Sequence, residues 1–243
     1  MNKYGLLGKS LSHSFSKDFF TKYFTENDIK AVYSNFEIAQ IDEVKSILES
    51  DIHGLNVTIP YKEAIIPFLD EITDDAKQIG AVNVVQFKNG KTMGHNTDAF
   101  GFAQSIKPFF TNQHERALLF GTGGASKAIA HVLKKLGVQV YFISTSQEGE
   151  GIFSYNDLNQ HMLVGCKLWV NCTPVGTFPN ENEELPIPWC ELTEDHLVVD
   201  LIYNPPKTMF LQKAQENGAT ILNGESMLKE QALKSWEIWQ KHL

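Results

Sequence analysis

Apolar and polar positions in residues 1–99 follow two spacings in turn, which predict strands and helices that alternate along the chain. Short apolar runs suit buried strands, and segments with apolar residues three or four positions apart suit amphipathic helices. We expect strands at Lys3–Gly8, Val32–Ile38, Gly54–Ile59 and Ala81–Phe87, and helices at Ser16–Phe24 and Ile41–Leu48. The dipeptide Asn89-Gly90 predicts a hairpin that returns through Thr92–Gly94.

The second half of the chain repeats a strand–helix unit. We expect strands at Ala117–Phe120, Val138–Ile143, Leu168–Asn171, Leu197–Leu201 and Thr220–Leu222, and helices at Ser126–Leu136, Lys207–Asn217 and Ser226–His242. Strands that alternate with helices form parallel sheets covered on both faces. The pattern therefore predicts an α/β protein with a parallel, doubly wound sheet.

The composition suits a folded chain and excludes several classes of protein. The 243 residues are 42% hydrophobic and 21% charged, and the net charge of −8 disfavours a general nucleic-acid binder. No run approaches the ~20 apolar residues of a membrane span, and the first residues lack the apolar core of a secretory signal. Three cysteines without a CxxC pair indicate a reducing, cytoplasmic location, and the histidine spacing indicates no metal site.

The basic residues are almost all lysine. Of 21 lysines and arginines, only Arg116 is an arginine, and it precedes a predicted strand as an expected surface charge. The planar guanidinium is the usual ligand of carboxylate and phosphate groups. Any anion that this chain binds must therefore contact mainly lysine, hydroxyl groups or backbone N–H groups.

A glycine-rich loop joins a predicted strand to a predicted helix. It contains Gly121, Gly123, Gly124 and Ala125. The first glycine permits a tight turn and the second lets the backbone approach a pyrophosphate at the helix N-terminus, where free N–H groups favour anions. Ser126 replaces the usual third glycine, so the loop is a variant of the dinucleotide-binding fingerprint, or a plain glycine-rich turn.

The residues at the end of the next strand normally determine whether such a domain binds NAD or NADP. An acidic residue there binds the ribose 2′-hydroxyl of NAD, and an arginine nearby accommodates the 2′-phosphate of NADP. Here the segment is Ser144-Thr145-Ser146, which contains neither residue type. The charge pattern therefore leaves both cofactors open.

Two hydroxyl side chains follow the first predicted strand. Ser14 and Ser16, two positions apart in a turn, can both donate hydrogen bonds to one carboxylate. The alternative is a helix N-cap at Ser16 beside a surface serine.

Other polar residues also occur near the ends of predicted strands. Lys62 follows Pro60 just after a strand, Asn83 interrupts an apolar run, and Asp98 precedes a possible helix that it could cap. A buried amide such as Asn83 needs hydrogen-bond partners. Singly, each residue also has an ordinary structural explanation.

Taken in order, these motifs resemble the shikimate dehydrogenase family over nearly the whole chain. The resemblance is carried by Gly5–Gly8, His13–Ser16, Asn56–Lys62, Gly80–Asn83, Asn96–Asp98, Gly121–Ala125, Asn171–Gly176, Asp200–Pro205, Gly224–Leu228 and Gln231-Ala232. It implies an α/β enzyme with two domains. Residues 1–99 plus 224–243 would form the substrate-binding catalytic domain, and residues 100–223 a doubly wound, Rossmann-like NADP-binding domain.

The family's reaction is the reversible, NADP-dependent reduction of 3-dehydroshikimate to shikimate, in aromatic amino acid biosynthesis by way of chorismate. By motif position, Lys62 and Asp98 would be the catalytic residues. The substrate would contact Ser14, Ser16, Thr58, Asn83, Asp98, Tyr203 and Gln231. The cofactor would contact Gly121, Gly123, Gly124, Ala125, Ser144, Thr145, Ser146, Thr173, Leu201 and Gly224.

The chemistry of these residues suits reduction of a ketone. A lysine ammonium can protonate the developing alkoxide and stabilise its charge. A neighbouring carboxylate favours the charged lysine, so we expect Asp98 to orient Lys62 and bind a substrate hydroxyl rather than to activate Lys62 as a base.

The resemblance leaves alternatives open. NADP-using members commonly have an arginine within the segment that here reads Ser144–Ser146, so we expect NADP with reduced discrimination against NAD. The other candidates are an NAD-using quinate/shikimate dehydrogenase, a ligand-sensing module without catalysis, and a folate dehydrogenase. We expect a small-molecule substrate, no nucleic acid, membrane or metal, and a monomer or homodimer.

Overall fold

The computed structural model describes residues 1–11, 14–189 and 191–241. Two positions of the sequence predictions, His13 in a family motif and His242 at the end of the last helix, lie outside these residues. The chain divides into two compact units. Unit 1 comprises Met1–Gly101 and Leu228–Leu243, and unit 2 comprises Phe102–Met227. Each unit is described by itself.

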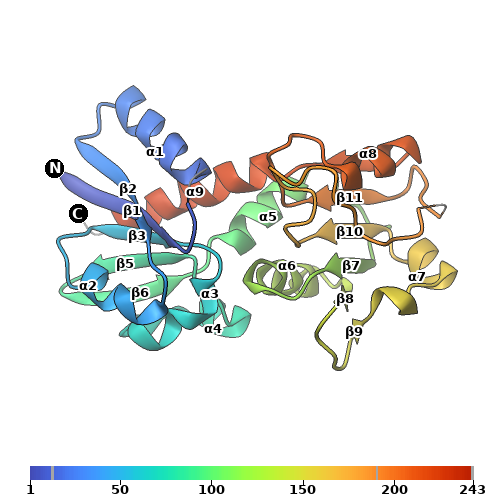
Figure 1. Cartoon of the computed structure of the whole chain (residues 1–243), viewed down its shortest axis with the longest axis horizontal. Helices are drawn as coiled ribbons and strands as arrows, with labels where there is room; N and C mark the ends of the chain where they lie inside the picture. Colours follow the sequence, from blue (N-terminus) through green and yellow to red (C-terminus); the bar gives the residue numbers. More distant parts are fainter. Residues whose placement is uncertain (12–13, 190, 242–243) are drawn as a thin grey trace. The chain divides into compact units, whose positions relative to one another are not determined.

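Unit 1 is built on a mixed six-stranded sheet in the order β2-β1-β3-β5-β6-β4 (Figure 1). The strands are β1 (Asn2–Gly8), β2 (Ala31–Glu37), β3 (Gly54–Val57), β4 (Glu71–Ile72), β5 (Val84–Lys88) and β6 (Lys91–His95). Strands β2, β1 and β3 are parallel, whereas β5 and β6 form the expected antiparallel hairpin.

Apolar side chains pack on both faces of this sheet. Side chains alternate between the faces of a strand. Tyr4 and Leu6 of β1 therefore join one apolar cluster, with Phe20 of α1 and Trp239 of α9, whereas Leu7 joins another cluster on the opposite face.

Helices surround the unit 1 sheet, and the last of them is anchored to it by hydrogen bonds. They are α1 (Phe15–Glu26), α2 (Val44–Leu48), α3 (Tyr61–Ala64), α4 (Asp74–Ile79), α5 (Asp98–Ile106) and α9 (Glu225–Gln240), with 3₁₀ turns at Ile41–Glu43 and Ile66–Phe68. The Trp239 indole donates to the Val85 carbonyl at 3.1 Å, and the Gln86 amide donates to the Ile238 carbonyl at 2.7 Å. The C-terminal helix is therefore fixed on β5.

Unit 2 has the doubly wound sheet that its repeated strand–helix pattern predicts. The strands are β7 (Arg116–Phe120), β8 (Gln139–Ile143), β9 (Ile152–Phe153), β10 (Leu168–Asn171), β11 (Leu197–Asp200) and β12 (Thr220–Leu222). They are parallel in the order β12-β11-β10-β7-β8-β9. This order reverses between β7 and β10, where such sheets bind ligands.

The helices of unit 2 are α6 (Gly124–Lys135), α7 (Gln160–Gly165) and α8 (Met209–Glu216), with a 3₁₀ turn at Tyr155–Asp157. Apolar side chains of α7, α8 and the sheet form a core that includes Phe120, Trp169 and Phe210. Arg116, at the start of β7, is exposed as expected.

The structure confirms the predicted α/β class and the long elements, and differs in the short ones. The strand expected at Ala81–Phe87 begins only at Val84, and the Val82 N–H before it donates to the Lys62 carbonyl, which lies outside the sheet. Elements such as α3, α4, α7, β4 and β9 escaped prediction because two to six residues are too few for a periodic pattern.

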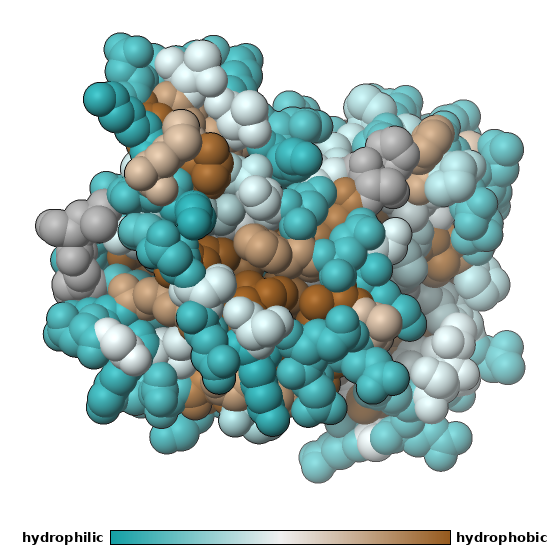
Figure 2. Space-filling view, turned by 60° about the vertical axis from the view of Figure 1, so that its left-hand side comes forward, coloured by the Kyte–Doolittle hydropathy of each residue, from teal (hydrophilic) through white to brown (hydrophobic). Residues whose placement is uncertain are grey.

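Hydrophilic side chains cover most of the face shown in Figure 2, with hydrophobic ones exposed between them. Such a mixture is usual for the surface of a globular protein. Among the described residues, none of the helices is long and apolar enough to cross a bilayer.

The packing of α9 on β3 depends on a glycine. A Cβ atom at Gly54 would lie 2.5 Å from Cε2 of Trp239, and an indole that is 3% exposed has little room to move. We predict that Gly54→Ala destabilises the chain by about 1–3 kcal/mol. Urea unfolding measures this loss.

Gly123→Ala is the matched control, because no described atom lies within 4 Å of a Cβ placed there and its φ of −75° suits alanine. It should leave the free energy of unfolding within about 1 kcal/mol of the original value. Equal effects of the two substitutions would show that Gly54 does not limit the packing of α9.

Candidate active site

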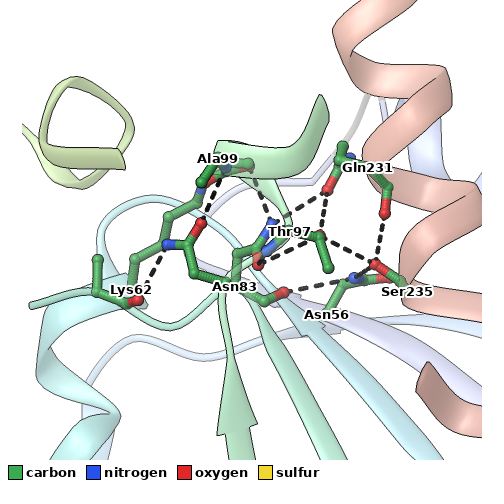
Figure 3. Close-up of polar contacts among 10 residues, drawn as sticks. Asn56, Lys62, Asn83, Thr97, Ala99, Gln231 and Ser235 are labelled. Atoms are coloured by element: carbon green, nitrogen blue, oxygen red, sulfur yellow. Dashed lines mark hydrogen bonds and ion pairs between the residues drawn. The ribbon is translucent and has the colours of Figure 1, made fainter. Parts of the chain in front are cut away.

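An ion pair with little exposure to solvent belongs to a cluster of polar side chains in unit 1, and Figure 3 shows the contacts of this cluster. The Lys62 Nζ atom, on α3, lies 2.6 Å from Oδ2 of Asp98, the first residue of α5. Their side chains are only 14% and 7% exposed. Such a pair loses much hydration on folding, so it needs further hydrogen bonds to be stable.

Asn83 supplies one of these hydrogen bonds and links the pair to other segments. Its amide nitrogen donates to Oδ1 of Asp98 at 2.9 Å, and lies within 3.1 Å of the Thr97 hydroxyl and the Gln231 side-chain oxygen. Its oxygen accepts from the Thr97 backbone N–H at 2.7 Å. The amide that interrupts an apolar run is thus fully bonded, and it orients Asp98 from the side opposite Lys62.

Helix α9 contributes two side chains to the same cluster. Gln231 and Ser235 are four residues apart and therefore share a helix face. The Ser235 hydroxyl accepts from the amide of Asn56, on β3, at 3.0 Å, and lies 3.3 Å from the Thr97 hydroxyl. Figure 3 shows these side chains converging from β3, α9 and the segment before α5.

The two serines after β1 have different surroundings. Ser14 is the N-cap of α1, because its hydroxyl oxygen accepts from the Lys17 N–H at 3.2 Å. Ser16 lies in the first turn of the helix and is 8% exposed. The N-cap residue is therefore Ser14. The alternative prediction from the sequence, an N-cap at Ser16, is wrong.

Thr58 lies where β1 and β3 end. Its backbone N–H donates to the Leu7 carbonyl at 2.9 Å. A Cβ atom at Gly8 would lie 2.8 Å from Cγ2 of Thr58, so glycine lets the two strand ends approach each other. Thr58 thus occupies the carboxyl edge of the sheet, where open α/β sheets bind ligands.

The glycine-rich loop of unit 2 lies at the switch between β7 and β10. Gly121 has φ of +101°, and a Cβ there would lie 3.1 Å from the Thr173 side chain. Gly123 is the N-cap residue of α6, whose first turn includes Gly124 and Ala125, and it has no side chain with which to cap the helix. Its first N–H groups are therefore available to an anion.

The segment after β8 forms a turn around Ser144. This residue is 7% exposed, and its hydroxyl oxygen accepts from the N–H groups of Ser146 and Gln147 at 3.2 and 2.9 Å. Thr145 and Ser146 are exposed. Ser144 thus shapes the turn, and Thr145 and Ser146 present their side chains to solvent.

A buried carboxylate joins the loops that follow β10 and β11. Asp200 accepts hydrogen bonds from the Thr208 hydroxyl at 2.6 Å, the Ile202 N–H at 3.0 Å and the Asn171 amide at 3.1 Å. The oxygen of Asn171 in turn accepts from the Thr173 hydroxyl at 2.7 Å. These hydrogen bonds hold both loops at the carboxyl edge of the sheet.

The pKa of Asp200 differs clearly from the usual value of an aspartate. Complete burial raises its pKa to about 6, although hydrogen bonds from Thr208, Ile202 and Asn171 oppose the shift. Asp200 therefore begins to take up a proton near neutral pH while the fold is intact.

The remaining expected site residues also lie in unit 2. Leu201 follows Asp200, and its carbonyl oxygen would lie 2.1 Å from a Cβ at Gly224, so only glycine fits there. Tyr203 is half-buried on the loop after β11. The structure thus brings Lys62, Asp98, Asn83 and Gln231 into direct contact, and assigns Tyr203 and the cofactor positions to the other unit.

Sequence reasoning missed Tyr33, Thr97 and Ser235 as members of the cluster. The Tyr33 hydroxyl donates to the Asn56 side-chain oxygen at 2.7 Å, which extends the hydrogen-bonded network into β2. The spacing of Ser235 from Gln231 is a usable signal, because it puts both on one helix face. Nothing in the sequence distinguishes Tyr33 from the other aromatic residues of the core.

Across residues 1–11, 14–189 and 191–241, the structure contains no group of histidine, cysteine or acidic residues that could hold a metal ion. The polar cluster around Lys62 in unit 1 consists of hydroxyls, amides and the Lys62–Asp98 ion pair. These groups can bind and protonate a polyhydroxylated organic molecule.

Comparison with known proteins identifies similar sequences and structures. Residues 6–85 match the model of the shikimate dehydrogenase substrate binding domain. A shikimate dehydrogenase (NADP(+)) of Clostridium botulinum is 36% identical, and the alignment covers 97% of this chain and 95% of that protein.

Two solved structures are also similar over their length. The shikimate 5-dehydrogenase of Thermus thermophilus, in complex with NADP(H) and shikimate, has a TM-score of 0.87 and 28% identity, and the match covers 100% of this chain and 95% of that one. The enzyme of Listeria monocytogenes, in complex with shikimate and NAD, has a TM-score of 0.86 and 27% identity, covering 98% and 91%.

The raised pKa of Asp200 predicts that the free energy of unfolding falls as the pH rises and the buried carboxyl group becomes charged. The folded pKa of about 6 exceeds the unfolded value of about 3.9, so its contribution to stability is complete below pH ~4 and is lost as the pH rises through ~6. Asp200→Asn keeps an oxygen for Ile202 and Asn171 but does not titrate. We compare the free energy of unfolding of the variant with that of the original chain. The difference between them should shift in favour of the variant by on the order of 2 kcal/mol from pH ~4.5 to pH ~7.5.

Urea unfolding of both proteins at the two pH values measures this difference. A stability difference that does not change with pH would contradict a raised pKa at Asp200. A change of the opposite sign would mean that hydrogen bonding to the charged carboxylate outweighs burial.

Proposed function

This chain belongs to the shikimate dehydrogenase family, and we propose that it catalyses the reversible, NADP-dependent reduction of 3-dehydroshikimate to shikimate. The enzyme class is an oxidoreductase, and its product would feed aromatic amino acid biosynthesis. The family membership rests on identity over nearly the full length of the curated relatives.

The observation that carries the proposal is the Lys62–Asp98 pair with its amide partner. Reduction of a ketone requires a proton at the oxygen that becomes the alcohol. The Lys62 ammonium carries that proton on Nζ, and Asp98 holds the nitrogen at 2.6 Å. Because Asn83 occupies Oδ1 of Asp98, the carboxylate cannot rotate freely, and Lys62 is held in one orientation.

Ser14 and Ser16 suit a substrate carboxylate. The Ser14 oxygen already accepts from Lys17, so its hydroxyl hydrogen is available to donate outward. The position at the N-terminus of α1 adds the favourable end of the helix dipole for an anion. This explains how a chain with a single arginine, remote in sequence from these serines, can bind an acidic substrate.

The remaining polar groups suit the hydroxyls of the substrate. We assign them to Thr58, Asn83, Asp98 and Gln231 in unit 1 and to Tyr203 in unit 2. Asp98 retains lone pairs beyond those used by Lys62 and Asn83, and can accept from a substrate hydroxyl. Asp98 thus orients Lys62 and also binds substrate.

The loop after β7 fits the pyrophosphate of a dinucleotide. Gly123 leaves the approach to α6 open, and the uncapped N–H groups at Gly124 and Ala125 can donate to phosphate oxygens. Gly121 adopts a conformation that favours glycine and allows the loop to pass close to Thr173. We assign Gly121, Gly123, Gly124 and Ala125 to cofactor binding.

Thr173, Leu201 and Gly224 suit the far end of the cofactor. When bound, the reduced nicotinamide supplies the hydride. Asn171 and Asp200 hold the Thr173 side chain and the Ile202 backbone in place, and the absence of a side chain at Gly224 lets its segment approach the Leu201 carbonyl. These loops can therefore present a defined surface to the ring.

The choice between NADP and NAD depends on the turn after β8. We assign Ser144, Thr145 and Ser146 to the ribose end of the cofactor. Only Thr145 and Ser146 expose hydroxyls that could bind a 2′-phosphate, and no acidic residue in this segment would repel one. NADP is therefore preferred with low discrimination. An NAD-using quinate/shikimate dehydrogenase is the second candidate, because the segment also lacks an arginine.

We assign substrate binding to residues 1–99 plus 224–243 and cofactor binding to residues 100–223. The partners are small molecules, with no nucleic acid or membrane, and the net charge of −8 agrees with this. Cys166 and Cys172 are free thiols, as expected for a cytoplasmic enzyme. The enzyme would act as a monomer or a homodimer.

Lys62→Ala tests the proposed acid/base residue. Turnover of shikimate with NADP⁺ should fall about 100-fold or more, while the KM for shikimate stays within about tenfold, because Lys62 acts mainly on the transition state. Initial rates at the nicotinamide absorbance band measure both values. Lys91→Ala is a matched control, since Lys91 pairs with Glu71 at 3.2 Å but is 67% exposed. Near-normal turnover of Lys62→Ala would exclude Lys62.

Thr145→Arg tests the position of the 2′-phosphate. A guanidinium there should raise the ratio of kcat/KM for NADP⁺ over NAD⁺ by about tenfold, because charge-assisted hydrogen bonds to phosphate are strong. Thr145→Gln supplies length without charge and should change the ratio little. If the unmodified enzyme clearly prefers NAD⁺, the assignment of NADP is wrong. If both variants behave alike, Thr145 does not face the phosphate.

A further inference from the structure

Asn171 connects a residue assigned to the cofactor with the buried hydrogen bonds of unit 2. It is the last residue of β10 and is completely buried. Its side-chain oxygen accepts from the Thr173 hydroxyl at 2.7 Å and from the Thr173 backbone N–H at 3.0 Å. Its amide nitrogen donates to Oδ1 of Asp200 at 3.1 Å. Both ends of this buried amide are therefore bonded, and the oxygen holds Thr173.

We propose that Asn171 is a positioning residue for the nicotinamide, and that it fixes the Thr173 hydroxyl as a hydrogen-bond acceptor for the amino group of the nicotinamide carboxamide. The inference rests on the proposed function, because the assignment of Thr173 to the cofactor comes from there. Asn171 acts through Thr173, since it is itself completely buried.

The orientation of the Asn171 amide follows from a backbone group. A backbone N–H can only donate, so the side-chain atom that faces the Thr173 N–H must be the oxygen. The amide nitrogen then faces Asp200, whose carboxyl group accepts its hydrogen. Because the Thr173 N–H alone identifies the oxygen, the orientation of Asn171 does not depend on whether Asp200 carries a proton.

The direction of the Thr173 hydroxyl hydrogen follows in turn. The Asn171 oxygen can only accept, so the hydroxyl that lies 2.7 Å from it must donate. A hydroxyl oxygen also has two lone pairs, and one of them accepts from the Val175 N–H at 3.3 Å. The second lone pair remains for a ligand. Thr173 therefore offers the cofactor an acceptor and no donor.

Packing also restricts the side chain of Thr173. A Cβ atom at Gly121 would lie 3.1 Å from Cγ2 of Thr173, so the methyl group of Thr173 lies against the glycine-rich loop. Threonine is stiff at χ1 because its Cβ carries two heavy atoms. With the methyl group beside Gly121 and the hydroxyl bonded to Asn171, the side chain is held in one rotamer. Thr173 is half-buried, in contrast to Asn171.

These properties suit one group of the nicotinamide. Its carboxamide has a nitrogen that donates hydrogen bonds and an oxygen that accepts them. An acceptor without a free hydrogen selects the nitrogen, and thereby determines which way the carboxamide faces. Groups that are ordered before binding lose less entropy when the ligand arrives. Asn171 thus helps to orient the ring that supplies the hydride.

Thr173→Val removes the hydroxyl and keeps the shape of the side chain. Calorimetric titration compares NADP⁺ with its acetylpyridine analogue, in which a methyl group replaces the carboxamide amino group. We expect the Kd for NADP⁺ to rise about fivefold, the effect of about one net hydrogen bond, and the Kd for the analogue to change less than about twofold. Thr173→Ser keeps a hydroxyl and should bind both cofactors like the original chain. Equal losses for the two cofactors, or no loss for NADP⁺, would overturn the proposal.

Asn171→Ala tests the positioning role. Without the Asn171 oxygen the Thr173 hydroxyl can turn and donate, so the preference for NADP⁺ over the analogue should fall about fivefold, as it does in Thr173→Val. Once Thr173 has no hydroxyl, Asn171 has nothing to position, so Asn171→Ala/Thr173→Val should have the same preference as Thr173→Val. Additive effects of the two substitutions, or an unchanged preference in Asn171→Ala, would overturn the role of Asn171.

Asn171→Asp is the second variant, and it decides the question if Asn171→Ala does not fold. It keeps an oxygen that accepts from Thr173, and two carboxyl groups in contact retain one proton, which replaces the lost amide hydrogen toward Asp200. The preference for NADP⁺ should therefore stay within about twofold of the original value. A fivefold loss of preference in a folded Asn171→Asp variant would overturn the proposal.

Thr208→Val is the matched control. Thr208 is 1% exposed, and its hydroxyl donates to Oδ2 of Asp200 at 2.6 Å, the carboxylate oxygen that Asn171 does not use. Thermal unfolding should show a loss of stability for both Thr208→Val and Asn171→Ala. The preference for NADP⁺ over the analogue should change for Asn171→Ala only. The same change for Thr208→Val would overturn a specific role for Asn171.

Binding of NADP⁺ and turnover of shikimate by the original chain separate failure of this inference from failure of the proposed function. A chain that binds neither NADP⁺ nor NAD⁺ would refute both. If the chain binds NADP⁺ without oxidising shikimate, the proposed function fails, and the Kd values still decide for or against Thr173 and Asn171. If the chain is active and Thr173→Val equals it in both Kd values, this inference alone is refuted.

Discussion

The hydrogen bonding of the buried Asn83 amide is the constraint on which the arrangement of the unit 1 cluster depends. A polar group that is 2% exposed must find partners within the protein, because leaving one unpaired costs about 1–3 kcal/mol. Asn83 finds them on Thr97, Asp98 and Gln231, which come from distant parts of the sequence. One amide thus joins the hairpin region, the start of α5 and the C-terminal helix.

The consequence for chemistry is that the Lys62–Asp98 pair is held from several sides. Asp98 bonds Lys62 with one oxygen and Asn83 with the other, so neither charge is left buried alone. The network continues through Ser235 and Asn56 to Tyr33. A connected polar network of this kind restricts side-chain motion, as a site that must orient several hydroxyl groups requires.

In unit 2 a buried carboxylate, rather than a buried amide, joins separate segments by hydrogen bonds. Asp200 is completely buried, and its three hydrogen bonds hold the loops after β10 and β11 and the start of α8. Here burial is only partly compensated, which is why the pKa of Asp200 remains raised. The open glycine loop lies beside this network at the switch between β7 and β10, so rigid loops flank an uncapped helix N-terminus.

The sequence by itself determined the long elements, the doubly wound order of strands and helices, the glycine loop and the family motifs, because hydrophobic spacing and turn residues act over a few neighbouring positions. Only the tertiary structure decided that Ser14 caps α1, that Ser144 is turned inward, and that Tyr33 and Ser235 join the cluster. These contacts link residues through packing and hydrogen bonds whose partners local spacing does not specify, and Tyr33 and Ser235 are separated by most of the chain.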